Sequence, residues 1–150
     1  MVKEKTKRIK YWLPPLLWMG FLFPLWNRLL SRPFLYRLNI KFWNWLIEDI
    51  SFYRTGLYYI YLRRFLHVVA YGLMAYLIYR FFKDGEKQIW KYSWAAFTAL
   101  ITIGYGCLDE ILQGILRSRS SSFLDILMDA LGTGLVLLGF FIAGKRQKRK

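Results

Sequence analysis

The chain has 150 residues, a length typical of a single domain. It is 56% hydrophobic and 20% aromatic, yet its formal net charge is +14. The apolar content excludes a disordered basic tail, and the aromatic content argues against a soluble nucleic-acid-binding domain. A single cysteine, Cys107, excludes an intrachain disulfide, and a single histidine, His67, leaves little room for a zinc site of the usual His/Cys type.

The first long apolar segment covers residues 11–30 and contains Pro14, Pro15 and Pro24. Its short length also fits a secretory signal peptide, which would need a small-residue cleavage site after the apolar run. Residues 27–30 read Asn-Arg-Leu-Leu and offer no such site. We therefore predict a membrane span over residues 11–30.

Residues 35–54 show a different pattern, with apolar and polar side chains on opposite sides of a predicted helix. Such a helix is too polar to cross a membrane and is expected to lie in the headgroup region. An amphipathic helix packed against the rest of the protein fits the same pattern. The apolar face consists of Leu35, Leu38, Phe42, Trp45, Leu46, Ile50 and Tyr53.

Three further apolar segments follow, at about residues 58–82, 89–113 and 123–143. A soluble bundle of buried helices would need polar residues repeating along each helix, but residues 130–143 contain only one, Thr133. Membrane spans are therefore favoured. The expected fold class is an all-α polytopic membrane bundle, with four transmembrane helices plus one interfacial helix, in a single membrane domain over residues 1–150.

The basic residues predict the orientation. With four spans, the two termini and the connection between the second and third spans share one side and carry 14 of the 23 basic residues, against 9 on the other. The positive-inside rule then places both termini in the cytoplasm. The basic run at residues 145–150 resembles a nucleic-acid-binding segment, but directly after a span it is interpreted as an anchor on anionic lipid. No nucleic-acid partner is expected.

Ionisable and amide side chains collect where the second span begins, the third ends and the fourth begins. On the predicted topology these positions share one end of the bundle, which faces away from the cytoplasm. Ionisable residues at membrane depth are functional candidates by default, because their burial is costly. The set comprises Arg63, Arg64, His67, Tyr71, Asp109, Glu110, Gln113, Arg117, Arg119, Asp125 and Asp129.

Several roles fit these residues. As structural contacts, Arg119 would pair with Asp125 or Glu110, and Gly132 would allow helices to approach closely. As a functional site, the arginines would hold an anionic group such as phosphate, with His67 or a carboxylate as proton acceptor. A divalent cation on the carboxylates is a further alternative. Because nearby basic residues neutralise the same carboxylates, no cofactor is expected.

The order and spacing of these residues resemble the VanZ-like family of membrane proteins. Residues 64–71 resemble the family's basic-x-x-His-x-x-x-Tyr pattern, and residues 109–113 resemble its Asp-Glu-x-x-Gln pattern. Arg119, Asp125 and Gly132 then follow at the family's spacing. The similarity covers about residues 60–140.

One position departs from the family pattern, since Asp129 stands where the family usually has Asn. An ionised carboxylate only accepts hydrogen bonds, whereas an amide also donates. The resemblance implies a bacterial multi-pass cell-membrane protein, associated with resistance to lipoglycopeptides of the teicoplanin type and sometimes to cationic antimicrobial peptides. The expected partners are membrane lipids or a lipid-linked envelope precursor, and an amphipathic antibiotic.

Three hypotheses follow, and whether the protein is an enzyme stays open. In the first, the protein binds a drug or envelope lipid at the outer leaflet, with Arg119 as the anion contact. In the second, a membrane-embedded hydrolase or transferase acts on a lipid-linked substrate, with His67 and Glu110 as catalytic residues. In the third, the cluster only locks helices together. The expected ligand-binding residues are Arg64, Tyr71, Asp109, Gln113, Arg119, Asp125 and Asp129.

Overall fold

The computed structural model describes residues 2–22, 37, 41, 52–84, 86–115 and 122–149, with side chains described from residue 11 in the first stretch and from residue 60 in the fourth. Within these ranges the chain forms helices and no strand, which confirms the predicted all-α class. The helices are α1 (Val2–Phe21), α4 (Phe52–Lys83), α5 (Tyr92–Ile115) and α6 (Phe123–Gln147).

Three of the described helical segments are long and apolar enough to cross a membrane: residues 60–83 of α4, and the whole of α5 and α6. The protein is therefore a multi-pass membrane protein. At about 1.5 Å per residue, α5 and α6 match or slightly exceed the roughly 30 Å of a bilayer's hydrocarbon core. These helices agree with the predicted second, third and fourth spans to within a few residues.

The described residues do not contain the predicted arrangement of four spans plus an interfacial helix. The predicted span at residues 11–30 is not among the described helices that are long and apolar enough to cross a membrane. The helix in that region, α1, begins at Val2 instead of residue 11, and its first half includes a run of lysine and arginine. Lysine and arginine are good helix formers, so the helix extends through them, while the described part of the predicted span, residues 11–22, is shorter than the roughly 20 residues that a membrane-crossing helix needs. Residues 23–30 lie outside the described residues. So does most of the predicted interfacial segment at 35–54, whose last three residues belong to α4.

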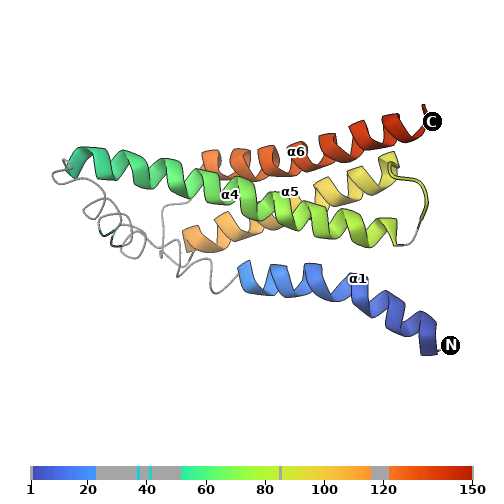
Figure 1. The fold of residues 1–150 in the computed structure, drawn as a ribbon. Coiled ribbons are helices and arrows are strands. Elements are labelled where there is room, and N and C mark those ends of the chain that lie inside the picture. The colour runs from blue at the N-terminus through green and yellow to red at the C-terminus, as the bar shows by residue number, and fades with distance from the viewer. Residues whose placement is uncertain are drawn as a thin grey trace.

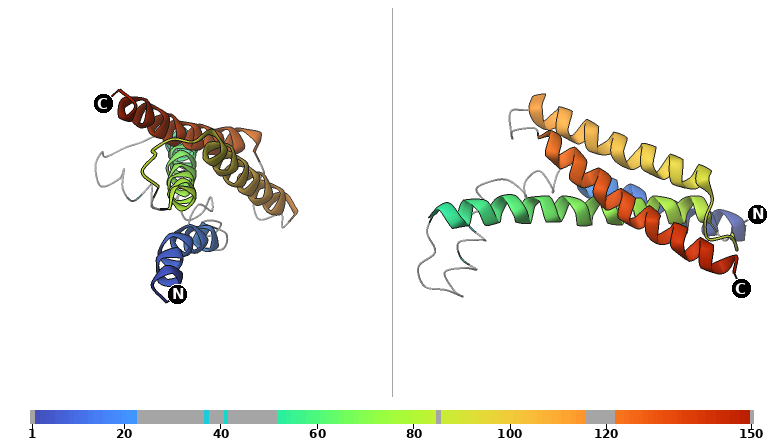
Figure 2. Two further views of the ribbon diagram at one scale, coloured as in Figure 1. Left: turned by 90° about the vertical axis from the view of Figure 1, so that its right-hand side faces the viewer. Right: turned by 90° about the horizontal axis from the view of Figure 1, so that it is seen from above.

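The helices α4, α5 and α6 lie side by side, and each runs antiparallel to the one before it in the chain. The helix α1 packs against α4 (Figure 1). Both termini lie at the same end of the bundle, which the two further views also show (Figure 2). The junction between α5 and α6 lies at the opposite end. The first turns of α4 extend beyond that junction (Figures 1 and 2).

The described helices place polar residues inside and apolar residues outside. On α5 the buried positions include Thr98, Thr102 and Gln113, whereas Phe97 and Leu100 are 53% and 70% exposed. The helix α6 follows the same pattern. This arrangement is typical of helices in lipid, where apolar side chains face the acyl chains and polar groups find partners within the bundle.

Two helices approach each other closely at Gly132 of α6, which packs on α4. A Cβ atom at Gly132 would overlap the backbone oxygen of Val68 and would lie 3.0 Å from the backbone nitrogen of Gly72. Only glycine fits there. Because of this contact, the residues of α4 and α6 one turn away, including His67 and Asp129, lie within hydrogen-bonding distance of each other.

Candidate functional site

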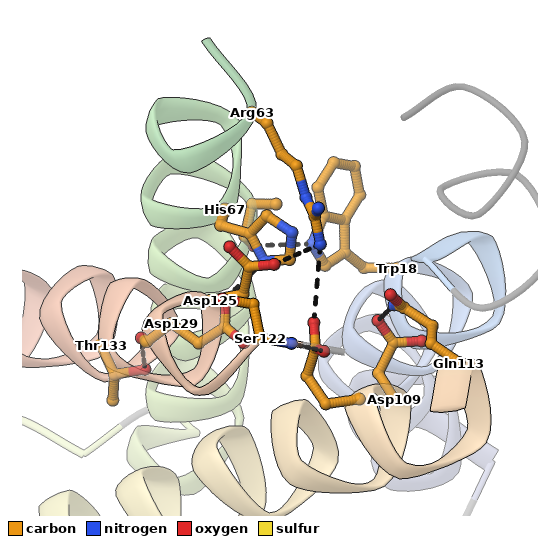
Figure 3. A network of polar contacts seen from close by, with 11 residues as sticks. Trp18, Arg63, His67, Asp109, Gln113, Ser122, Asp125, Asp129 and Thr133 are labelled. Atoms are coloured by element: carbon orange, nitrogen blue, oxygen red, sulfur yellow. Dashed lines mark hydrogen bonds and ion pairs between the residues drawn. The ribbon is translucent and has the colours of Figure 1, made fainter. Parts of the chain in front are cut away.

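Buried polar side chains from three helices meet at the end of the bundle opposite the termini (Figure 3). Each side chain in this polar cluster belongs to a residue that is at most 8% exposed. Because α5 ends and α6 begins at this end, acidic residues of these two helices converge with Arg63 and His67 of α4. The polar cluster consists of Arg63 and His67 from α4, Asp109, Glu110 and Gln113 from α5, and Asp125 and Asp129 from α6.

Arg63 joins all three helices. Its guanidinium donates a hydrogen bond to the carboxylate of Asp125 and lies 4.0 Å from Oε1 of Glu110. Arg64 and Arg119 were the basic residues predicted as ligand-binding, but Arg64 is only half-buried. The spacing did not separate the two residues, since Arg63 and Arg64 precede His67 by four and three residues and both lie on its face of the helix.

His67 is held by a carboxylate of α6. Its Nδ1 atom lies 2.8 Å from Oδ1 of Asp129, and both side chains are 1% exposed. The ring of Tyr71 lies nearly parallel to the imidazole, with ring centroids 6.0 Å apart. The carboxylate contact orients the imidazole and favours the tautomer with a proton on Nδ1 and the lone pair on Nε2.

Gly106 of α5 makes room for Asp129. A Cβ atom there would lie 2.7 Å from Oδ2 of Asp129 and 3.2 Å from the ring of Tyr71. The residue was not predicted from the sequence, where it is one of 11 glycines. Its role depends on how closely α5 approaches α6, which a single sequence does not reveal.

Glu110 connects α5 to the start of α6. Its Oε2 atom accepts a hydrogen bond of 2.8 Å from the backbone N–H of Ser122, the residue before α6. Backbone N–H groups at a helix N-terminus lack partners within the helix and carry partial positive charge, so a carboxylate is favourable there. Asp125 lies in the first turn of the same helix.

Asp109 and Gln113 form a pair on α5, as their i, i+4 spacing predicts. The amide of Gln113 donates a hydrogen bond of 2.6 Å to Oδ2 of Asp109. On the same part of the bundle, the hydroxyl of Tyr105 donates to the backbone oxygen of Met19, and Trp18 donates to the backbone oxygen of Ala70. These two bonds fix α1 against α4 and α5 beside the polar cluster.

The structure therefore brings together most of the residues expected from the sequence. His67, Glu110 and Asp125 each offer a possible ligand atom, and the three atoms lie within 4.8 Å of one another. Arg117 and Arg119 fall in residues 116–121, outside the described residues. Among the described members of the polar cluster, four carboxylates face one guanidinium, so the cluster is acidic when the carboxylates are ionised.

Comparison with known proteins adds one finding. A family model described as VanZ/LLP1 matches residues 11–144 of the chain. No curated protein and no solved structure was found to match. The matched region contains α5 and the polar cluster, and it begins within α1, well before the motifs that carry the resemblance in the sequence.

Proposed function

The chain belongs to the VanZ/LLP1 family, and from that premise we propose that it binds an amphipathic antibiotic or a cell-envelope lipid at the polar cluster, on the outer leaflet of a bacterial cell membrane. Such binding would give resistance to lipoglycopeptides of the teicoplanin type or to cationic peptides, as the family resemblance implies. Members of the cluster would contact the polar group of the ligand, while its apolar part stays in the acyl region.

The observation that carries the proposal is the burial of several ionisable side chains at one point. Each buried ion costs several kcal/mol of desolvation, even after partial compensation by partners. Helices in lipid can associate through small residues and neutral hydrogen bonds, as Gly132 and the hydrogen bonds of Trp18 and Tyr105 illustrate. An acidic cluster is therefore an expensive way to hold helices together, which supports a functional role.

The outer-leaflet assignment rests on the arrangement of the ends. The two termini lie together, and the polar cluster lies at the opposite end. Because the terminal segments are strongly basic, the positive-inside rule favours a cytoplasmic position for them and an external one for the cluster.

Cysteine labelling tests this orientation. In a background with Cys107→Ala, a membrane-impermeant maleimide should label Ser121→Cys in intact cells, and should label Arg149→Cys only after lysis. The reverse pattern would place the polar cluster on the cytoplasmic side and would contradict the proposal.

A resistance assay tests the binding role. Expression of the wild-type chain in a susceptible host should raise the minimum inhibitory concentration of a teicoplanin-type drug, and Glu110→Gln or Asp125→Asn should abolish the increase. Arg119→Ala tests the anion contact expected from the sequence. The matched control is Glu86→Gln, which removes an exposed carboxylate near the termini that pairs with Lys91 at 3.6 Å. Unchanged resistance in the cluster variants, at equal protein levels, would refute the proposal.

A second candidate function is a membrane-embedded hydrolase or transferase acting on a lipid-linked envelope substrate. The contact between His67 and Asp129 favours it, because a carboxylate that orients an imidazole is a recurring arrangement for a general base. Turnover of lipid-linked phosphate or acyl substrates by the purified protein, lost in His67→Gln, would support an enzyme. Lipid binding without turnover would favour the first proposal.

A further inference from the structure

We propose that the polar cluster contains a binding site for one divalent transition-metal ion, with His67, Glu110 and Asp125 as ligands. These residues come from α4, α5 and α6, and their possible ligand atoms all lie within 4.8 Å of one another. Two ligand atoms bound to one ion at about 2.1 Å in tetrahedral geometry are about 3.4 Å apart. A pair of atoms 4.8 Å apart would therefore need to close by about 1.4 Å, through rotation of the two carboxylate side chains.

The environment of His67 is the first argument for this site. Histidines that bind metals usually donate their other ring N–H to a carboxylate, which fixes the ring and raises its basicity. The contact of 2.8 Å between Nδ1 of His67 and Oδ1 of Asp129 has this arrangement. Asp129 therefore acts as the residue that positions the imidazole, and Nε2 is the ligand atom.

The carboxylate ligands are also held in place. The backbone N–H of Ser122 fixes one oxygen of Glu110, and Arg63 donates to one oxygen of Asp125. A carboxylate has two oxygens and several lone pairs, so each residue can keep this contact and still bind an ion. Metal-binding carboxylates are commonly held by such hydrogen bonds.

The charge balance is the second argument. Among the described members of the polar cluster, Asp109, Glu110, Asp125 and Asp129 face the single positive charge of Arg63, and all five residues are buried. Interactions between charges are strong in a medium of low dielectric constant, so the excess negative charge attracts a cation. A divalent ion would reduce this excess more effectively than a single proton.

The donor set indicates the class of metal. One imidazole nitrogen with two carboxylates suits Mn²⁺ or Zn²⁺ better than Mg²⁺ or Ca²⁺, which prefer oxygen ligands alone. Three protein ligands leave a coordination position open. This part of the inference rests on the proposed function: the open position would accept an oxygen of the drug or lipid, which explains how an acidic cluster could hold an anionic group.

Metal titration of the purified full-length chain tests the site without any drug or lipid. After treatment with a chelator, the protein in detergent or nanodiscs is titrated with Mn²⁺ and followed by electron paramagnetic resonance. We expect one bound ion per chain, with hyperfine coupling to one imidazole nitrogen. Zn²⁺ should compete for the same site. No stoichiometric binding, or binding without nitrogen coupling, would overturn the proposal even if no variant can be purified.

Three variants localise the ion. Glu110→Gln should weaken binding at least 100-fold, because it replaces an anionic ligand. Asp129→Asn should weaken it by about 10- to 100-fold, the usual effect of changing a residue that positions a metal ligand. The matched control Asp109→Asn removes an equally buried carboxylate on α5 that is not a ligand, and it should weaken binding the least. Equal loss in all three would indicate nonspecific attraction and would overturn the site. Since the resistance assay is separate, metal binding and the proposed function can fail independently.

Discussion

At the end of the bundle that carries the termini, α4 and α6 meet through aromatic rings, whereas at the other end they meet through charged side chains. The rings of Tyr79 and Phe140 stack with centroids 4.1 Å apart, and the ring of Trp90 stacks with that of Tyr79 at 5.9 Å. The corresponding contacts at the far end are Arg63 with Asp125 and His67 with Asp129.

The aromatic contacts show that α4 and α6 can be joined without the desolvation of buried ions. Stacked aromatic pairs add about 0.5–1.5 kcal/mol each beyond the burial of their area, with no ion to desolvate. Buried ion pairs often add nothing to stability relative to apolar residues of similar volume. The charged end therefore contributes little that aromatic contacts could not supply, which argues for a function other than holding helices.

The largest effect is expected from removing the single guanidinium of the polar cluster. Arg63→Met should destabilise the protein by about 3–5 kcal/mol, because the carboxylates of Asp125 and Glu110 would remain buried without it. The loss can be measured as a shift of the unfolding transition in detergent.

The double variant Arg63→Met/Asp125→Leu converts the charged contact into an apolar one and so tests the comparison directly. We expect it to recover part of the lost stability, because Glu110 still lacks the guanidinium, while resistance stays abolished. If resistance returns along with stability, the pair is structural and the functional interpretation of the charged end is wrong.

The next effect concerns the glycine contact that lies between the two ends. Gly132→Ala should cost about 3 kcal/mol or somewhat less, because the added Cβ would overlap the backbone oxygen of Val68 and force α4 away from α6. The matched control is Gly134→Ala, two residues further on, where a Cβ would meet nothing within 4 Å. The difference between the two melting temperatures measures the effect, and equal values would contradict the close approach.

A smaller but more local effect is expected at Gly106. Gly106→Ala would displace Oδ2 of Asp129, at a cost of about 1–2 kcal/mol, since a side chain can move more easily than a backbone. The control is Gly104→Ala, where a Cβ would meet nothing within 4 Å. Because Asp129 holds His67, resistance and metal affinity should fall more than stability does. A loss of stability alone would mean that Asp129 does not position the histidine.

Part of the fold and of the polar cluster could be predicted from the sequence. Hydropathy predicted the three spans to within a few residues, and the positions of His67, Glu110, Asp125 and Asp129 near span ends predicted their convergence. Each of these inferences depends only on local pattern and on the alternation of antiparallel helices.

The features that the sequence did not predict depend on how helices face each other. Arg63 and Arg64 are both within one turn of His67, and the rotation of α4 decides which of them is buried. That rotation follows from the packing of Gly132 on α4, a contact between distant segments. The predicted N-terminal span is not found among the described residues, where only residues 11–22 of it are present and helix α1 begins in the basic residues that were expected to precede it.

The smallest predicted effect lies at the aromatic end. The hydroxyl of Tyr79 donates to the backbone oxygen of Ile89 at 3.1 Å and accepts from the backbone N–H of Lys91 at 3.3 Å. Tyr79→Phe keeps the ring stacking but removes both bonds, and should cost about 1 kcal/mol. Resistance and metal affinity should be unchanged, because both hydrogen bonds of this hydroxyl are to residues at the aromatic end and not to the polar cluster. Normal stability of Tyr79→Phe with reduced metal affinity would show that the ends are coupled, and the comparison between them would no longer hold.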